Sequence, residues 1–147
     1  MKPWVCKVCG HIEFDQAPET CPVCRAAKSA FVENEAAIKK PANPAQLTEG
    51  DKKHIPQIVV VKECGLIPGG CCTDVHVRVG EIEHVMQDAH YIGWVDYYLN
   101  RKYIARMYFT PGVCHPAAAL HMNAKEGTVA VIESCNVHGC WMAEAKI

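Results

Sequence analysis

The chain has 147 residues, half of them hydrophobic, and its 15 Lys and Arg nearly balance its 16 Asp and Glu. This length allows one domain or two small ones, and the balanced charge argues against nucleic-acid or membrane-surface binding as the main task. No apolar run is long enough to cross a membrane and no signal peptide begins the chain, so we expect a cytoplasmic protein that neither binds nucleic acid nor enters a membrane.

Cysteines dominate the N-terminal segment. Cys6 and Cys9 form one C-x-x-C pair, and Cys21 and Cys24 form a second. Because cytoplasmic thiols are kept reduced, the pairs indicate metal ligands rather than disulfides. Two such knuckles give tetrahedral sulfur coordination, which suits iron or zinc, and without a metal so short a segment would have little to fold around. We therefore predict a small metal domain with four cysteine ligands over residues 1–34.

A linker is expected over residues 35–46. Residues 35–40 favour one or two turns of helix, and Pro41 and Pro44 prevent its continuation. The second domain would then comprise residues 47–147.

This second part has a strand-like pattern. Residues 74–79 alternate strictly between valine and polar side chains, and five further short segments are rich in β-branched or aromatic residues. The expected strands are 57–61, 74–79, 91–99, 103–109, 117–122 and 128–133, with a hairpin connection at 99–102. Six or seven short strands predict a mostly β protein with a β-sandwich domain.

A second metal site is indicated near the C-terminus. Cys135 and His138 are three residues apart, with Asn and Gly nearby for a tight turn, so a thiolate and an imidazole can point into one small volume. His54, His84 and His90 can supply the other ligands. Four imidazoles and one thiolate would suit iron, although each histidine taken alone would more often be a solvated or core residue.

Four ordered motifs resemble those of the superoxide reductases, the desulfoferrodoxin and neelaredoxin family. They are KHIP, HVMQDAHYIGW, FTPGVCHPAA and ESCNVHGCW, and they cover roughly residues 50 to 145. The N-terminal pieces WVCKVCGHIEF and APETCPVC, followed by residues 28–31, are similar to the rubredoxin-like domain of rubrerythrins, which favours iron over zinc there. The desulforedoxin domain of two-iron superoxide reductases ends instead in adjacent cysteines.

The resemblance implies an immunoglobulin-like sandwich that reduces superoxide to hydrogen peroxide at a non-haem iron. In that family four imidazoles lie in a plane with the thiolate beneath, roles that would fall to His54, His84, His90, His138 and Cys135. Lys53 would place a positive charge near the open face. The family also implies rubredoxin or a similar protein as the electron donor, and a homodimer or homotetramer.

One departure concerns the residue before that lysine. Family members commonly carry a glutamate there that closes the sixth iron position on oxidation, whereas Lys52 stands there in this chain. Glu49 and Asp51 are near but out of register. We therefore expect oxidised iron without a bound carboxylate.

Five cysteines remain outside these sets: Cys64, Cys71, Cys72, Cys114 and Cys140. The first three could form a redox disulfide, hold a further iron or iron–sulfur centre, or remain reduced thiols. Cys114 and Cys140 follow the Pro-Gly turn and the ligand loop, which brings them toward the iron. The alternative to an enzyme is a non-catalytic electron carrier or metal-binding protein.

Overall fold

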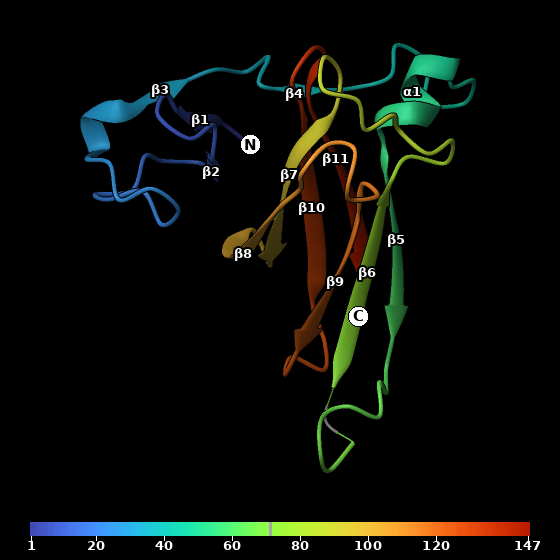
Figure 1. Cartoon of the computed structure of the whole chain (residues 1–147). Coiled ribbons are helices and arrows are strands. Elements are labelled where there is room, and N and C mark those ends of the chain that lie inside the picture. The colour runs from blue at the N-terminus through green and yellow to red at the C-terminus, as the bar shows by residue number, and fades with distance from the viewer. Residues whose placement is uncertain (71) are drawn as a thin grey trace.

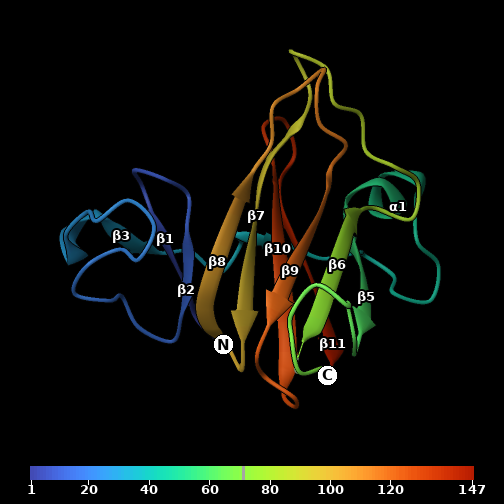
Figure 2. The same cartoon turned by 60° about the horizontal axis from the view of Figure 1, so that its bottom comes forward.

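The computed structural model describes residues 1–70 and 72–147, so Cys71 lies outside the described residues. The N-terminal unit is a three-stranded antiparallel sheet with the order β2-β1-β3, followed along the chain by the single short strand β4. Its elements are β1 (Pro3–Cys6), β2 (Ile12–Phe14), the 3-10 helix η1 (Lys28–Ala30) and β3 (Phe31–Glu33). Cys6, Cys21 and Phe31 pack at its centre. This unit lies beside β8 in both Figure 1 and Figure 2.

The connection that follows does not form the expected helical turns. Residues 35–36 make a turn, and β4 (Ile38–Lys39) pairs in parallel with the last strand of the chain, with Ile38 opposite Cys140. The helix prediction for residues 35–40 was wrong because Ile38 is buried, and backbone pairing with a sheet edge holds it there.

The remaining chain forms two packed sheets. The five-stranded sheet has the order β4-β11-β10-β7-β8, and the three-stranded sheet has the order β5-β6-β9. Their strands are β5 (Pro56–Val61), β6 (Thr73–Val79), β7 (Ile92–Leu99), β8 (Lys102–Tyr108), β9 (Ala117–Met122), β10 (Thr128–Cys135) and β11 (Gly139–Lys146). The mostly β architecture with a β-sandwich is confirmed, and all six predicted strands are present within two residues of their expected ends.

Strand β7 is buried on both faces because two different cores cover it. Val95 and Tyr97 point into the core between the two sheets. Trp94 and Tyr98 point the other way, into a core shared with Ile12 and its neighbours in the N-terminal unit. The N-terminal unit therefore covers the outer face of the larger sheet.

Among the described residues of 47–147, two elements were not predicted from the sequence. They are the short helix α1 (Glu49–His54) and the last strand, β11. Within the described residues, no helix has the length and apolar character needed to cross a bilayer.

Candidate metal centres

The four N-terminal cysteines converge on one point. Sγ of Cys6 lies 3.7 Å from Sγ of Cys24, and Sγ of Cys9 lies 3.6 Å from Sγ of Cys21. A tetrahedral ion with metal–sulfur bonds of about 2.3 Å requires sulfur–sulfur distances of about 3.8 Å. The four sulfur atoms are therefore spaced to hold one iron or zinc ion.

The two knuckles have the same local geometry. The carbonyl of Cys6 accepts a hydrogen bond from the N–H of Gly10 at 2.8 Å, and that of Cys21 accepts one from Arg25 at 3.0 Å. Gly10 and Arg25 both have positive φ, at 76° and 68°. Each C-x-x-C turn thus closes on the fourth residue after its first cysteine, which turns both sulfur atoms of a pair toward the same side.

This knuckle is fixed to the outer face of the larger sheet. Nη1 of Arg106, on β8, donates to the carbonyl of Cys9 at 2.9 Å, and its guanidinium lies 3.7 Å from the ring centre of Trp94. A Cβ on Gly10 would lie only 3.2 Å from the Trp94 ring, so a side chain there would push the two units apart. The metal knuckle is therefore part of one packed structure.

A buried ion pair reinforces this contact. Asp96, on β7, accepts hydrogen bonds from Arg106 and, at 3.0 Å, from Nδ1 of His11, and both His11 and Asp96 have no exposed surface. Burial opposes the charged form of His11, but hydrogen bonds to Asp96 and Glu13 outweigh it and raise the pKa of His11 above its ordinary value. Sequence reasoning missed this role, because a lone histidine after a cysteine knuckle has no distinctive pattern.

The second centre is a closed ring of four imidazoles at one end of the sandwich. Neighbouring ring centres are 4.6–5.0 Å apart in the order His54, His84, His90, His138 and back to His54. Together with Cys135 they offer five ligand atoms that all lie within 4.8 Å of one another. The structure thus gathers all five residues named from the sequence.

Backbone carbonyls orient two of these rings. Nδ1 of His54 lies 2.7 Å from the carbonyl of Gly50, and Nδ1 of His84 lies 2.7 Å from that of Val85. Each Nδ1–H therefore donates outward, and Nε2 is left with a lone pair, as in histidines that bind metals. Nε2 of His54, His84 and His90 is buried without a hydrogen-bond partner among the described residues. Buried polar atoms normally have partners, so a metal ion fits these nitrogens.

The two buried rings are held in their neutral form. Burial lowers the pKa of His84 to about 4 and lowers the pKa of His54 below its ordinary value. A neutral imidazole is the form that binds a metal, because protonation would occupy the coordinating nitrogen. The ring of histidines is therefore suited to a cation at neutral pH.

The thiolate position is set by a turn between β10 and β11. Sγ of Cys135 lies 3.7 Å from Nδ1 of His138 and accepts a hydrogen bond from the backbone N–H of His138 at 3.4 Å. Asn136 joins this turn to the loop that carries His90: its Oδ1 accepts from the N–H of Tyr91 at 2.9 Å, and its Nδ2 donates to the carbonyl of Ala89 at 3.1 Å. Asn136 therefore fixes the relative position of two ligand loops.

Helix α1 presents Lys53 and His54. Thr48 begins it with a capping box: its hydroxyl accepts from the N–H of Asp51, whose carboxylate accepts from the N–H of Thr48. The chain at Gly80 passes so close that a Cβ there would lie 2.3 Å from the carbonyl oxygen of Lys52. A glycine at this position lets the loop that carries His84 pack against the end of the helix.

A cavity of about 570 Å³ opens on this ring. It is lined by all four histidines together with Glu49, Lys53 and Trp141, whereas Cys135 does not line it. Cys135 is 3% exposed and belongs to the core between the sheets. The sulfur therefore approaches from the core side, and a small molecule would arrive from the opposite side.

The positive charge of Lys53 at this cavity is paired with a carboxylate of the same helix. Nζ of Lys53 lies 3.0 Å from a carboxylate oxygen of Glu49, one helical turn earlier. Lys52 does not line the cavity. Asp51 is 6% exposed and is engaged in the capping box. Both Glu49 and Asp51 line the cavity, and Glu49 is the one that forms an ion pair with Lys53.

Glu133 is a buried acidic residue near Cys135 that sequence reasoning missed. It lies on β10 two residues before Cys135, is fully buried, and neither carboxylate oxygen has a hydrogen-bond partner among the described residues. Burial raises its pKa well above the ordinary value, which favours the protonated carboxyl. An acidic residue inside an otherwise apolar strand is the one sequence signal that could have marked it.

The remaining cysteines lie outside this centre. Cys140 packs in the core shared with the N-terminal unit. Cys114 lines a separate cavity of about 450 Å³ that it shares with His84 and Met86. Cys64 and Cys72 are free thiols that converge with two further side chains at the other end of the sandwich.

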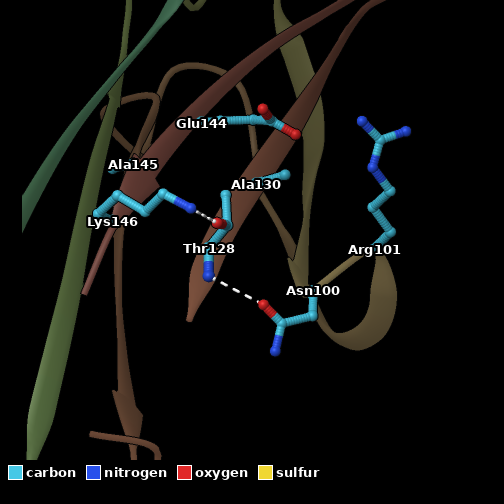
Figure 3. A pocket seen from close by; sticks show the side chains of 7 residues that line it. All are labelled: Asn100, Arg101, Thr128, Ala130, Glu144, Ala145 and Lys146. Atoms are coloured by element: carbon cyan, nitrogen blue, oxygen red, sulfur yellow. Dashed lines mark hydrogen bonds between the residues drawn. The ribbon is translucent and has the colours of Figure 1, made fainter. Parts of the chain in front are cut away.

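Another cavity, of about 440 Å³, has no connection with the metal centres. Figure 3 shows it beside the hairpin between β7 and β8, where Asn100 accepts a hydrogen bond from the N–H of Thr128 at 3.0 Å and Lys146 reaches the hydroxyl of Thr128. Thr128 and Cys135 are at opposite ends of β10. The concentration of ligand groups therefore selects the cavity of about 570 Å³ as the functional one.

Comparison with known proteins agrees with this geometry. Residues 46–144 match the family model described as desulfoferrodoxin, and residues 4–32 match the rubredoxin-like domain of rubrerythrin. The chain belongs to the desulfoferrodoxin family. It is 36% identical over 93 residues to the desulfoferrodoxin of Desulfarculus baarsii, a match that covers 63% of each chain. It is 27% identical over 144 residues to a desulfoferrodoxin homolog of Archaeoglobus fulgidus, which covers 97% of this chain and 96% of that one.

A solved structure shares the fold. The superoxide reductase from Nanoarchaeum equitans is 29% identical with a TM-score of 0.59, and the match covers 75% of this chain and 99% of that chain. The resemblance expected from the four sequence motifs, and from the N-terminal cysteine pattern, is confirmed by these matches.

Proposed function

We propose that this protein is a superoxide reductase, which converts superoxide to hydrogen peroxide at a non-haem iron bound by His54, His84, His90, Cys135 and His138. The observation that carries this proposal is the ring of imidazoles with three unpartnered Nε2 atoms, open to a cavity on one side and closed by a thiol on the other. Five protein ligands on an ion that accepts six leave one position for a small anion.

The residues around the cavity would each have a definite task. A bound ferrous ion would supply the electron that superoxide accepts, and two protons from water would complete hydrogen peroxide. The four imidazoles would hold the ion through neutral nitrogen atoms, and the Cys135 sulfur would donate electron density to it from the core side. Lys53 provides positive charge at the cavity, where it would attract an anion and donate a hydrogen bond.

The N-terminal cysteines would hold a second iron ion, with zinc as the other metal that suits the same sulfur geometry. We further propose a rubredoxin-like domain at residues 1–34, a linker at 35–46 and a catalytic domain at 47–147. An external rubredoxin or a similar donor would return the electron. A homodimer or homotetramer in the cytoplasm completes the proposal, by analogy with the family.

Peroxide stoichiometry under a flux of superoxide with excess reductant tests the function. A reductase forms one peroxide for each superoxide consumed, whereas a dismutase forms one for every two, and a mere electron carrier adds nothing to the spontaneous reaction. We expect the first ratio, and we expect Cys135→Ala and His90→Ala to abolish the activity. Full activity in either variant would remove these residues from the site.

A further inference from the structure

A third group of metal-type ligands lies at the end of the sandwich remote from the imidazole ring. Cys64, Cys72, Asp74 and His121 offer four ligand atoms that all lie within 4.8 Å of one another. Cys64 lies in the connection between β5 and β6, Cys72 precedes β6, and Asp74 and His121 lie on β6 and β9. Two separate stretches of the sequence, residues 64–74 and the strand that carries His121, thus place sulfur, oxygen and nitrogen around one point.

The sheet itself aligns three of these groups. Asp74 and His121 are direct partners in the antiparallel pairing of β6 with β9, so their side chains leave the same face. Cys72 is two residues before Asp74, and side chains two apart in an extended segment point to the same side. The fourth ligand, Cys64, comes from the loop that folds over this face.

The distances are close to those of a tetrahedral site. Sγ of Cys72 lies 2.7 Å from Oδ1 of Asp74 and 3.2 Å from Nδ1 of His121, and that nitrogen lies 2.8 Å from the same carboxylate oxygen. Around a zinc ion, neighbouring ligand atoms are about 3.3–3.8 Å apart. Replacing the shared protons by a cation would require these pairs of atoms to move apart by about 0.3–0.8 Å.

Burial gives the group a reason to bind a cation. Cys72 is 3% exposed and Asp74 is 5% exposed. The Cys72 thiol donates a hydrogen bond to the Asp74 carboxylate, and a thiolate beside that carboxylate away from water would be costly unless a further positive charge compensated it. The other oxygen of Asp74 lies 3.8 Å from Nε2 of His76. A divalent cation would satisfy both groups at once.

We propose that Cys64, Cys72, Asp74 and His121 bind a zinc-type divalent ion, separate from the two centres described above. Two sulfur atoms and one imidazole favour zinc over calcium or magnesium, which prefer oxygen. Binding releases the two thiol protons, while His121 binds as the neutral imidazole and Asp74 as the carboxylate. Four protein ligands leave no open position, so the ion is structural and fastens Cys64 and its neighbours to β6 and β9.

This site is independent of the proposed superoxide chemistry. Strand β6 extends from the cluster at Thr73 to Val79, which pairs with Pro56 just after α1. Its length of about 20 Å separates the two ends, and residues 62–70 lie at the lower end of Figure 1, opposite α1. Loss of this ion should therefore leave the spectrum of the iron at the imidazole ring unchanged.

Native mass spectrometry of the full-length protein can count the ions. With iron in both other centres, wild-type protein incubated with zinc should carry one further ion, and Cys64→Ser should not. His121→Gln, which changes a partly exposed side chain, should bind that zinc at least about tenfold more weakly. Mutating a residue that only hydrogen-bonds to a metal ligand already weakens metal binding by about this factor, so removing a ligand should weaken it by at least as much. His115→Gln changes an exposed histidine paired with Glu83 and should keep the ion. Cys71→Ser should also keep it, because the four ligands are complete without Cys71.

Several results would overturn the assignment. One is wild-type protein that takes no third ion, and another is a third ion retained by both Cys64→Ser and His121→Gln. Loss of the ion in His115→Gln or Cys71→Ser would contradict the ligand set. A Cys64–Cys72 disulfide in protein that has never been exposed to oxidant would identify a redox pair instead. An unchanged iron spectrum in each variant shows that its fold is intact.

Discussion

The ion pair between Lys53 and Glu49 should limit how strongly the cavity attracts superoxide. Nζ of Lys53 is 3.0 Å from the Glu49 carboxylate, and both groups line the cavity beside the imidazole ring. Replacing Lys53 by Met removes one of the two cations that line the cavity, Lys39 being the other, and leaves the charge of Glu49 without its partner. Replacing Glu49 by Gln leaves the charge of Lys53 without its partner. The two substitutions should therefore change the rate with superoxide in opposite directions.

Coulomb's law sets the size of these effects. At about 6 Å and an effective dielectric of about 20, Lys53 attracts a unit anion by about 3 kcal/mol, and Glu49, about 3 Å farther away, repels it by about 2 kcal/mol. The net attraction of about 1 kcal/mol corresponds to about a fivefold higher concentration of the anion at the cavity. The Lys53 side chain is 40% exposed and that of Glu49 is 74% exposed, so solvent reduces each contribution further. We expect a rate about three- to tenfold lower in Lys53→Met and about two- to fivefold higher in Glu49→Gln.

Pulse radiolysis at several ionic strengths measures the second-order rate constant directly. The differences should be largest at low salt, because salt screens exposed charges. Lys52→Met is the matched control, since Lys52 carries the same charge one residue away but does not line the cavity. A Lys53→Met rate equal to that of wild type or of Lys52→Met would refute the reasoning. So would a slower Glu49→Gln.

Three further predictions concern the interface, the ligand loops and the oxidised iron. His11→Gln should lower the free energy of unfolding by about 1–3 kcal/mol. Because the folded pKa of His11 is raised, the stability that this residue gives is complete below about pH 6.5 and declines as pH rises through that folded pKa. The loss measured by denaturant titration should therefore be larger at pH 6 than at pH 9. Asn136→Ala should release iron to a chelator about tenfold faster or more, because two ligand loops lose their connection, and wild-type retention would contradict this. Glu49→Gln should leave the absorption spectrum of the oxidised iron unchanged, since we expect no carboxylate there, and a spectral shift would show that Glu49 binds the iron.

Much of the metal chemistry could be predicted from the sequence because ligand residues have strong chemical identities. Two C-x-x-C pairs specify a site almost by themselves, and the separation of Cys135 and His138 is short enough to require convergence. The strands were also predictable, since strict alternation of valine with polar residues, as in residues 74–79, is typical of a strand with one buried face. The hairpin at Asn100 and Arg101 has positive φ at both residues, at 48° and 66°, as a two-residue turn requires.

Other features depend on contacts that no local pattern contains. Strand β11 has its apolar residues irregularly placed, and it is a strand because β10 pairs with it along its whole length. Helix α1 has only six residues, too short for a periodic signal, and the capping box at Thr48 is completed by an aspartate rather than the usual glutamate. The third cluster combines residues up to 57 positions apart, from Cys64 to His121, through strand pairing. Pairing partners cannot be read from a single sequence.

The position of Trp94 suggests why the two proposed iron sites share one chain. Its indole packs against Gly10 and Arg106 on the side of the metal knuckle, while its backbone is paired with Ser134, the residue before Cys135. Arg106 in turn bonds the carbonyl of Cys9. A continuous series of contacts therefore runs from a sulfur ligand of one site to the sulfur ligand of the other through β7 and β8. The buried pairing of His11 with Asp96 keeps this series in place, since it joins the same strand to the knuckle.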